Sequence, residues 1–402
     1  MRVLFVTPTQ LDPADSGGKL VSRGLVEGLR RRGHRVDVHA LPRGRAVLQE
    51  SSAAKPRLRH TLRHLATWAA HPYPVAKYWS DETYRRLRAV VLAGSHDIVH
   101  CDHLHAAEYG LRLIREMGVP CVLLQHNAEH VLWKGAARVG WNVPRRLFCA
   151  WEASRIYDYE HRVVEAFDAC IALTEDDANA LRPPGNRGRV VTLRPGWNRQ
   201  ASELPSGDGE DAVVVFVGRT DWFPNLDGMV WFVRHVWPKV LERQPRTRLR
   251  IVGGYPPRAV RRLNRCPGVD VVGWVEDPLQ SLMRGQVVIA PLRIGSGIRI
   301  KILQALAAGR PVVSTPVGCA GLGLREEVEI LIGRDEESLA LQTVRLLREP
   351  KLRQRIAVAG LAFMQRWPTE DRAAARLESV YEECVGRRAG LRDEAPRWRY
   401  AP

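Results

Sequence analysis

One turn in the second half of the chain combines glycines and basic residues in an order typical of anion-binding sites. An apolar run at 287–290 precedes the turn, whose residues are Gly295, Ser296, Gly297, Ile298, Arg299 and, two positions further, Lys301. A helix that begins after such a turn presents unpaired backbone N–H groups and the positive end of its dipole to a ligand. Because that dipole disfavours cations, Arg299 and Lys301 indicate a more strongly negative partner, and we expect a diphosphate. At this point an ordinary strand-to-helix turn with two solvated cations is an equal alternative.

Glycine and polar residues also follow three other apolar runs. They are Gly17 and Gly18 after 2–6, His126 and Asn127 after 121–125, and Gly218 and Arg219 after 212–217. Parallel α/β sheets place their ligand groups at the carboxyl ends of the strands. The glycines allow a phosphate to approach the backbone, and the histidine predicts a hydrogen-bonding or acid/base group.

Histidines and cysteines are numerous, but their spacing does not match a metal site. The histidines near the strand ends are His100, His103, His105, His126 and His130, and their mixed spacing fits no standard ligand pattern. The seven cysteines stand singly, without a Cys-x-x-Cys pair, so neither a zinc site nor a disulfide framework is expected. We expect no metal.

The elements that position these residues alternate between apolar runs and helical patterns. Strands are predicted at 2–6, 35–41, 97–105, 121–125, 168–174 and 190–194, and again at 212–217, 249–252, 269–272, 287–290 and 311–313. Helical spacing follows most of them, including a long segment at 144–167 and a helix from about 298 to 309. Such alternation predicts an α/β protein with two Rossmann-like, doubly wound parallel sheets facing each other across a cleft.

Composition and turn-rich stretches suggest the domain boundaries. We predict an N-terminal domain at 1–198, a polar linker at 199–211 and a C-terminal domain at 212–368. A final helix and tail at 369–402 would follow a break at Trp367 and Pro368 and cross back towards the N-terminal domain, with Thr369 as its cap.

Bulk properties exclude several classes of protein. The 402 residues are 45% hydrophobic and 26% charged, as in a globular protein of two domains. The apolar run at the start is too short for a signal peptide or a membrane span, so we expect a cytoplasmic protein. A formal net charge of +17 attracts polyanions. No nucleic-acid-binding signature accompanies it, so we expect no specific nucleic acid, and peripheral contact with an anionic membrane face stays open.

The segment at 43–80 is basic and amphipathic, with arginines and histidines interleaved among leucines and Trp68. It could lie on an anionic membrane surface, but a solvated helix packed on its own domain is the favoured interpretation.

Several motifs together resemble the retaining glycosyltransferases of the GT-B fold known as group 1 or family four. Besides the turn at 295–301 they are Ser16-Gly17-Gly18, His126-Asn127, the segment 194–198 (RPGWN), the segment 216–219 (FVGR) and the segment 272–277 (VGWVED). The resemblance extends over nearly the whole chain and is strongest at 213–321.

The resemblance implies a nucleotide-diphosphate sugar as co-substrate and no other cofactor. Arg219, Arg299 and Lys301 would bind the donor diphosphate, and Gly17 and Gly18 would close over the phosphates. The backbone at Trp274 and Val275 would receive the base, and Gly218 and the residues of the turn would also bind the donor. His126 would contact the donor sugar or stabilise the developing charge, and the acceptor would enter from the N-terminal side.

Three positions depart from the family pattern. A lysine common six positions after the arginine is Asn225 here, and two common glutamates are Ser296 and Gln304. Gln304 could still bind ribose hydroxyls, because it lies one helical turn beyond Lys301. We expect a glycosyltransferase that retains anomeric configuration. A non-catalytic nucleotide- or sugar-binding protein on the same scaffold and a GT-B nucleotide-sugar epimerase remain alternatives.

Overall fold

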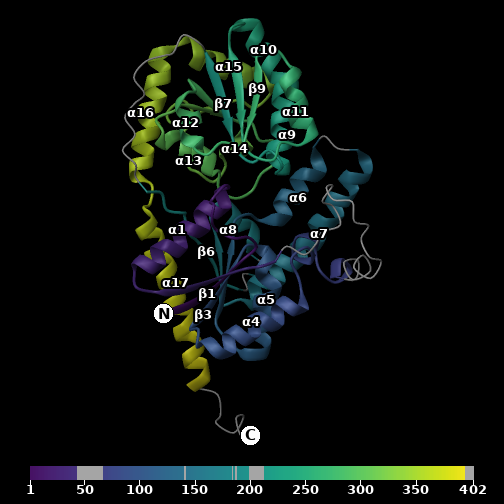
Figure 1. Cartoon of the computed structure of the whole chain (residues 1–402), viewed down its shortest axis with the longest axis vertical. Coiled ribbons are helices and arrows are strands. Elements are labelled where there is room, and N and C mark those ends of the chain that lie inside the picture. Colours follow the sequence, from purple (N-terminus) through teal and green to yellow (C-terminus); the bar gives the residue numbers. More distant parts are fainter. Residues whose placement is uncertain (43–66, 140–141, 183, 186–187, 199–211, 394–402) are drawn as a thin grey trace. The chain divides into compact units, whose positions relative to one another are not determined.

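The computed structural model describes residues 1–42, 67–139, 142–182, 184–185, 188–198 and 212–393 (Figure 1). The predicted linker at 199–211 and most of the basic segment at 43–80 lie outside these residues. The chain divides into two compact units. The N-terminal unit comprises residues 1–133, 148–197 and 368–402, and the C-terminal unit comprises residues 134–147 and 198–367.

The N-terminal unit is built on a six-stranded parallel sheet in the order β2-β1-β3-β4-β5-β6. Its strands are β1 (Arg2–Thr7), β2 (Arg35–Ala40), β3 (Ile98–Asp102), β4 (Cys121–Gln125), β5 (Ala169–Ala172) and β6 (Val190–Thr192). The helices that follow these strands are α1 (Gly17–Arg31), α3 (Tyr73–Ala76), α4 (Asp81–Gly94), η1 (Leu104–Ala106), α5 (Ala107–Met117), α6 (Glu129–Arg138), α7 (Val143–Ala166) and α8 (Glu175–Leu181). Strands β3, β4 and β5 are buried along their whole length, and β4 and β5 accordingly consist almost entirely of apolar residues.

The C-terminal unit repeats the design with the strand order β12-β11-β10-β7-β8-β9, again parallel. Its strands are β7 (Val213–Val217), β8 (Arg248–Val252), β9 (Val269–Gly273), β10 (Val287–Ala290), β11 (Val312–Ser314) and β12 (Leu331–Ile332). Its helices are α9 (Phe223–Trp231), η2 (Phe232–Val236), α10 (Trp237–Arg243), α11 (Arg258–Arg261), η3 (Arg262–Arg265), α12 (Pro278–Met283), α13 (Ile300–Ala307), α14 (Pro316–Cys319), α15 (Glu336–Arg348) and α16 (Pro350–Arg366). The fold class predicted from the sequence, two Rossmann-like parallel sheets, is confirmed.

The last helix, α17 (Glu370–Asp393), packs against α1 in the N-terminal unit, as the sequence predicted. A Cβ added at Gly28 of α1 would lie 2.7 Å from the Cβ of Ala374, so only glycine permits this approach. Further along, the Tyr381 hydroxyl lies 2.7 Å from Nδ1 of the buried His100. The Thr369 hydroxyl accepts a hydrogen bond from the Arg372 N–H at 3.3 Å, which confirms the predicted cap.

Two further observations bear on the sequence predictions. Helix α13 begins at Ile300, two residues later than the pattern indicated, and Arg299 is its N-cap residue. None of the helices in the described ranges is both long and apolar enough to cross a membrane.

The packing of α17 predicts a strong effect of truncating its buried face. Leu377 is fully buried, so Leu377→Ala should lower the free energy of unfolding by about 2–5 kcal/mol, because it leaves a cavity. Urea denaturation followed by circular dichroism measures this change. The neighbouring exposed Arg376→Ala serves as control and should change stability by less than about 0.5 kcal/mol. Equal stability of the two variants would contradict the packing of α17 as a core element.

Candidate functional site

In the C-terminal unit, the carboxyl ends of β7 and β8 approach so closely that both require glycine. The Gly218 N–H donates to the Val252 carbonyl at 3.0 Å, and a Cβ on Gly253 would lie 2.0 Å from the Gly218 carbonyl oxygen. Both glycines have positive φ values, 151° and 159°. The loops that leave the two strands therefore emerge side by side, and the Arg219 guanidinium carbon lies 5.4 Å from the ring centre of Tyr255.

Lys301, Asn225 and Arg219 meet at this strand end. The Lys301 ammonium donates to Asn225 Oδ1 at 2.6 Å, and Asn225 Nδ2 donates to the Arg219 carbonyl at 2.7 Å. The same ammonium lies 4.1 Å from the ring centre of Phe216, and a Cβ on Gly218 would come within 2.9 Å of it. Asn225 thus links Lys301, which lies 76 positions away in the sequence, to the loop that carries Arg219.

Burial destabilises the charge on Lys301. It lowers the pKa of Lys301 well below its usual value, and the positive charge of Arg299 lowers that pKa further. Because an anion beside the ammonium would reverse both effects, this lysine is suited to a negatively charged ligand.

The Arg219 side chain is held by Asp221. Its Nε and Nη2 donate to the two carboxylate oxygens at 3.0 and 2.6 Å. Both side chains are about one third exposed, so solvent screens the pair and a phosphate could compete for the guanidinium.

Arg299 lies inside the glycine turn rather than on its surface. The side chain is only 4% exposed, and the guanidinium donates to the carbonyls of Ser296, Gly297 and Val317. A Cβ on Gly295 would lie 2.2 Å from Arg299 Nη2. This geometry favours a role in holding the turn over the direct diphosphate contact that the sequence led us to expect.

The start of α13 has no side-chain cap and no acidic residue in its first turn. Lys301 and Gln304 are both half-buried along this helix. Ser296, which replaces a family glutamate, is buried at the turn, and Gly297 has a φ of 78° that favours glycine. No side chain at the start of α13 therefore accepts a hydrogen bond from the first N–H groups of this helix.

Trp274 and Val275 lie beyond the end of β9, in the same sheet as β7 and β8. The Trp274 side chain is 66% exposed, and its Cδ1 lies 3.4 Å from the position of a Cβ on Gly254. The Gly254 carbonyl accepts a hydrogen bond from the Thr220 hydroxyl at 3.2 Å, which ties this loop to the one that carries Arg219. The exposed indole is available for stacking.

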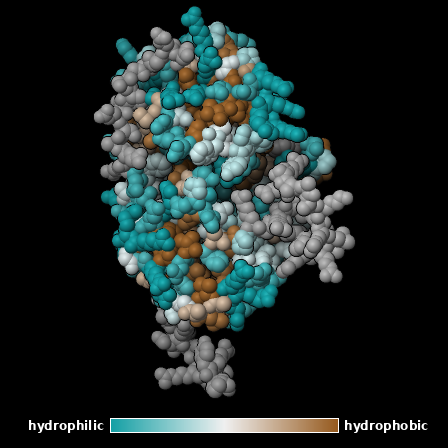
Figure 2. Space-filling model, viewed as in Figure 1, coloured by the Kyte–Doolittle hydropathy of each residue, from teal (hydrophilic) through white to brown (hydrophobic). Residues whose placement is uncertain are grey.

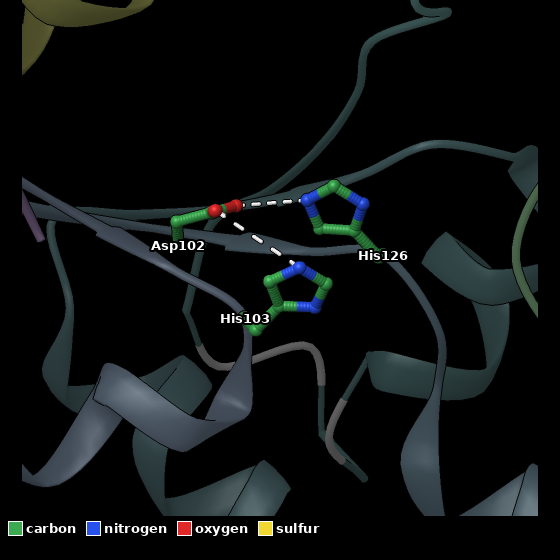
Figure 3. A group of neighbouring side chains, drawn as sticks. All are labelled: Asp102, His103 and His126. Atoms are coloured by element: carbon green, nitrogen blue, oxygen red, sulfur yellow. Dashed lines mark hydrogen bonds and ion pairs between the residues drawn. The ribbon is translucent and has the colours of Figure 1, made fainter. Parts of the chain in front are cut away.

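In the N-terminal unit, His126 is held by a buried carboxylate that the sequence did not single out (Figure 3). His126 Nε2 lies 2.8 Å from Asp102 Oδ1. The other oxygen of Asp102 accepts hydrogen bonds from the hydroxyls of Thr7 at 2.8 Å and Ser22 at 2.9 Å. Asp102 ends β3 and His126 follows β4, and because β3 and β4 are neighbours in the sheet their ends meet.

His103 completes this cluster by stacking on His126, with ring centres 3.7 Å apart and planes 12° apart. A Cβ on Gly18 would lie 3.4 Å from His103 Cε1 and 3.6 Å from His126 Nδ1, so the turn at Gly17 and Gly18 passes over both rings. His103 itself has an unusual φ of 66°.

The neighbouring groups shift the pKa values of Asp102 and His103. Burial alone would raise the pKa of the Asp102 carboxyl, but His103 and His126 outweigh burial and hold that pKa below its usual range. Burial lowers the pKa of His103 well below its usual value, and the charge of His126 lowers it further. An ionised Asp102 only accepts hydrogen bonds, so His126 Nε2 carries the proton and Nδ1 faces the glycine turn.

Asp102, His103 and His126 have ligand atoms within 4.8 Å of one another. The two imidazole rings are nearly parallel, so their in-plane lone pairs do not converge on one point. Both oxygens of Asp102 already accept hydrogen bonds. The arrangement fits a hydrogen-bonded pair better than a chelating site.

The polar residues after His126 have structural partners. Glu160 accepts hydrogen bonds from the N–H groups of Glu129 at 2.9 Å and His130 at 3.2 Å, and it lies 2.6 Å from His130 Nδ1. Burial, and then the charge of Glu160, raise the pKa of Glu129 to about 7. The start of α6 is therefore built around a buried carboxylate, and His130 belongs to that structure.

Sequence reasoning thus named His126, Arg219, Asn225 and Lys301 but missed Asp102, His103 and Asp221 as their partners. The available signal for Asp102 was its place in the polar second half of the strand predicted at 97–105, which the structure ends at Asp102.

Comparisons with known proteins identify the family of this chain. The model described as "Glycosyl transferases group 1" matches residues 211–349, and the model described as "Glycosyltransferase Family 4" matches residues 16–201. The D-inositol 3-phosphate glycosyltransferase of Thermobifida fusca is 26% identical over 304 residues, which cover 69% of this chain and 67% of that protein.

Solved structures of low sequence identity share the fold. The sucrose-phosphate synthase of Thermosynechococcus elongatus superposes with a TM-score of 0.71 at 17% identity, covering 96% of this chain and all of that one. HepE of Anabaena, solved in complex with UDP-glucose, has a TM-score of 0.62 at 13% identity over 95% of this chain and all of that one. With the two family models together matching most of its length, the chain belongs to the group 1 and family 4 glycosyltransferases, retaining enzymes of the GT-B fold that use nucleotide-sugar donors.

Proposed function

We propose that this glycosyltransferase binds the diphosphate of its donor at the end of β7 and transfers the sugar with retention to an acceptor hydroxyl. The observation that carries the proposal is the contact of the Lys301 ammonium with Asn225 beside Gly218. It brings a half-buried cation to the strand end where a parallel sheet binds its ligand.

Asn225 stands where relatives commonly carry a lysine, and its side chain touches Lys301. We infer that Lys301, from α13, supplies the cation that this loop lacks. Arg219, released from Asp221 by the stronger acceptor, supplies the second cation.

Other donor contacts follow from the same arrangement. The exposed Trp274, with the Val275 backbone, would receive the base, and Gln304 would hydrogen-bond the ribose. The N–H groups at the start of α13 would bind phosphate oxygens or the donor sugar, in place of the missing glutamate at Ser296. Since HepE has been solved with UDP-glucose, a UDP-sugar is the first donor to test.

The reaction needs no protein nucleophile. The bond from the anomeric carbon to the diphosphate oxygen breaks, the acceptor oxygen bonds to the same face, and the acceptor proton passes to the departing phosphate. Lys301 and Arg219 would stabilise the charge that develops on the leaving group. His126, with its Nδ1 facing Gly18, would accept a hydrogen bond from the donor sugar and fix its position.

The products of an incubation distinguish a transferase from the two alternatives, a non-catalytic binding protein and an epimerase on the same scaffold. Only the transferase converts a donor and an acceptor into a glycoside of unchanged anomeric configuration. We would screen UDP, GDP, ADP and dTDP by thermal shift, then incubate the best nucleotide's sugars with candidate acceptors and assign the product by NMR.

Removing either proposed diphosphate cation should cost more than 100-fold in turnover, because each stabilises the leaving group. The variants are Lys301→Ala and Arg219→Ala, with the exposed Lys351→Ala and Arg284→Ala as controls. Steady-state release of the nucleoside diphosphate measures the effect. Full activity in both site variants would remove these residues from the site.

Binding of the nucleoside diphosphate should be accompanied by proton uptake at Lys301. The pKa of this lysine is depressed in the free protein, and a bound diphosphate raises it. Affinity should therefore be highest below the depressed pKa and fall as pH rises from there towards the pKa of the complex. Calorimetry at pH about 8, above the second pKa of a phosphate near 6, in buffers of different ionisation enthalpy counts the protons. Lys301→Met should abolish the uptake, and uptake that persists in this variant would assign it elsewhere.

Asp102→Asn should lower kcat by at least about 10-fold with a smaller change in KM, because the amide no longer fixes the tautomer of His126. Asp37→Asn is a control for the loss of an aspartate–histidine contact elsewhere in the same sheet, since the partly exposed Asp37 lies 2.9 Å from His96 at the β2 edge. A purely structural role of Asp102 would instead give equal kcat losses in both variants, or a loss explained by unfolding in thermal melts.

A further inference from the structure

The β8–β9 edge of the C-terminal unit carries a row of arginines that the proposed reaction does not use. Arg258 and Arg261 lie on α11, and Arg262 and Arg265 lie on η3. Their positions follow the spacing i, i+3, i+4 and i+7, which places all four on one face of a helical segment. Val260 and Leu263, between them, are buried in the core on the other side. Hydrophilic residues cover the surface in Figure 2 where Figure 1 places α11.

These four guanidinium groups are exposed and, among the residues that the structure describes, have no ion pair or hydrogen bond. Other arginines of the same unit are paired: Arg293 with Asp227, Arg334 with Glu326 and Arg345 with Glu327. The row is therefore a concentration of unneutralised charge, whose members repel one another unless an anion lies between them.

The four side chains also shape the surface. Together they line a hollow of about 280 Å³. A second hollow, of about 320 Å³, is lined by Pro245, Arg246, Thr247, Arg248 and Gly268. The two hollows are linked in the sequence, because Arg265 lines the first and Gly268, three positions later, lines the second. The Thr247 hydroxyl is buried and has no hydrogen-bond partner within the described part of the chain.

We propose that this row, together with Arg246 and Arg248 of the second hollow, is a docking surface for the phosphate headgroups of an anionic phospholipid bilayer. A guanidinium donates two parallel hydrogen bonds to a phosphate and sheds its hydration more easily than an ammonium. Several phosphates spread over a surface would neutralise charges that one small anion in one hollow would leave unpaired.

A single-stranded nucleic acid fits the same row less well. Such ligands are held by aromatic side chains on which bases stack, in addition to positive charge. Of the residues described, no aromatic side chain lines either hollow. The row therefore offers contacts to phosphate groups but no aromatic side chain on which a base could stack.

The test uses the full chain and sedimentation with vesicles of phosphatidylcholine containing about one third phosphatidylglycerol, at about 0.15 M ionic strength. We expect the protein to bind these vesicles and not pure phosphatidylcholine. Replacement of Arg258, Arg261, Arg262 and Arg265 by glutamine should weaken binding by at least about 50-fold, since each arginine near an anionic surface contributes about fivefold. Donor turnover and the thermal melt should be unchanged.

The control variant removes four exposed cations that are spread over α16 and α17, Lys351, Arg355, Arg372 and Arg376. It lowers the net charge equally and should weaken binding less than about fivefold. The proposal is overturned if the two variants lose binding equally, if the wild-type protein does not distinguish the two vesicles, or if an oligonucleotide or inorganic phosphate at millimolar concentration displaces it from them.

Discussion

The burial of one cation, Lys301, is the constraint on which the candidate site depends. A lysine ammonium taken out of water is unstable unless a partner or a ligand supplies negative charge. The partners here are neutral or weak: the Asn225 amide oxygen and the face of Phe216. Neighbouring Arg299 adds positive charge, and the first turn of α13 holds no acid. The donor diphosphate that we propose for this site would supply the missing negative charge.

The N-terminal unit contains a buried group of the opposite charge, the carboxylate of Asp102. Asp102 is a buried anion whose partners are provided by the protein itself: two hydroxyls and the His126 ring. A satisfied buried network of this kind is rigid, because every departure leaves a polar group unpaired. Its product is an imidazole of fixed tautomer and orientation beside Gly18. The Lys301 environment thus contains an ammonium without a nearby carboxylate, whereas the Asp102 carboxylate has its hydrogen-bond donors within the protein.

The sequence allowed prediction of the fold and of which polar residues follow its strands, but not of how arginines would be used. Strands such as β4 and β7 are buried and consist mainly of apolar residues, so their ends and the residues after them could be placed. Arg299, Arg219 and Arg258 look alike in the sequence. In the structure Arg299 holds a turn, Arg219 pairs with a nearby carboxylate and Arg258 has no partner among the described residues. These differences arise from contacts within and between loops, which no periodicity records. Asp102 was missed for the same reason, since its partners come from β1, α1 and the loop after β4.

The replacement of two common glutamates changes what the donor site can discriminate. Carboxylates at 296 and 304 would accept hydrogen bonds from sugar and ribose hydroxyls and would also offset the charge of Lys301. With Ser296 buried in the turn and Gln304 neutral, the site is left more positive. Attraction to the diphosphate should rise, because fewer negative charges oppose it, while selection among sugars must rest on backbone N–H groups and shape. A glycosyltransferase built in this way gains affinity from a part of the donor that all nucleotide sugars share, so its specificity has to come from elsewhere in the complex.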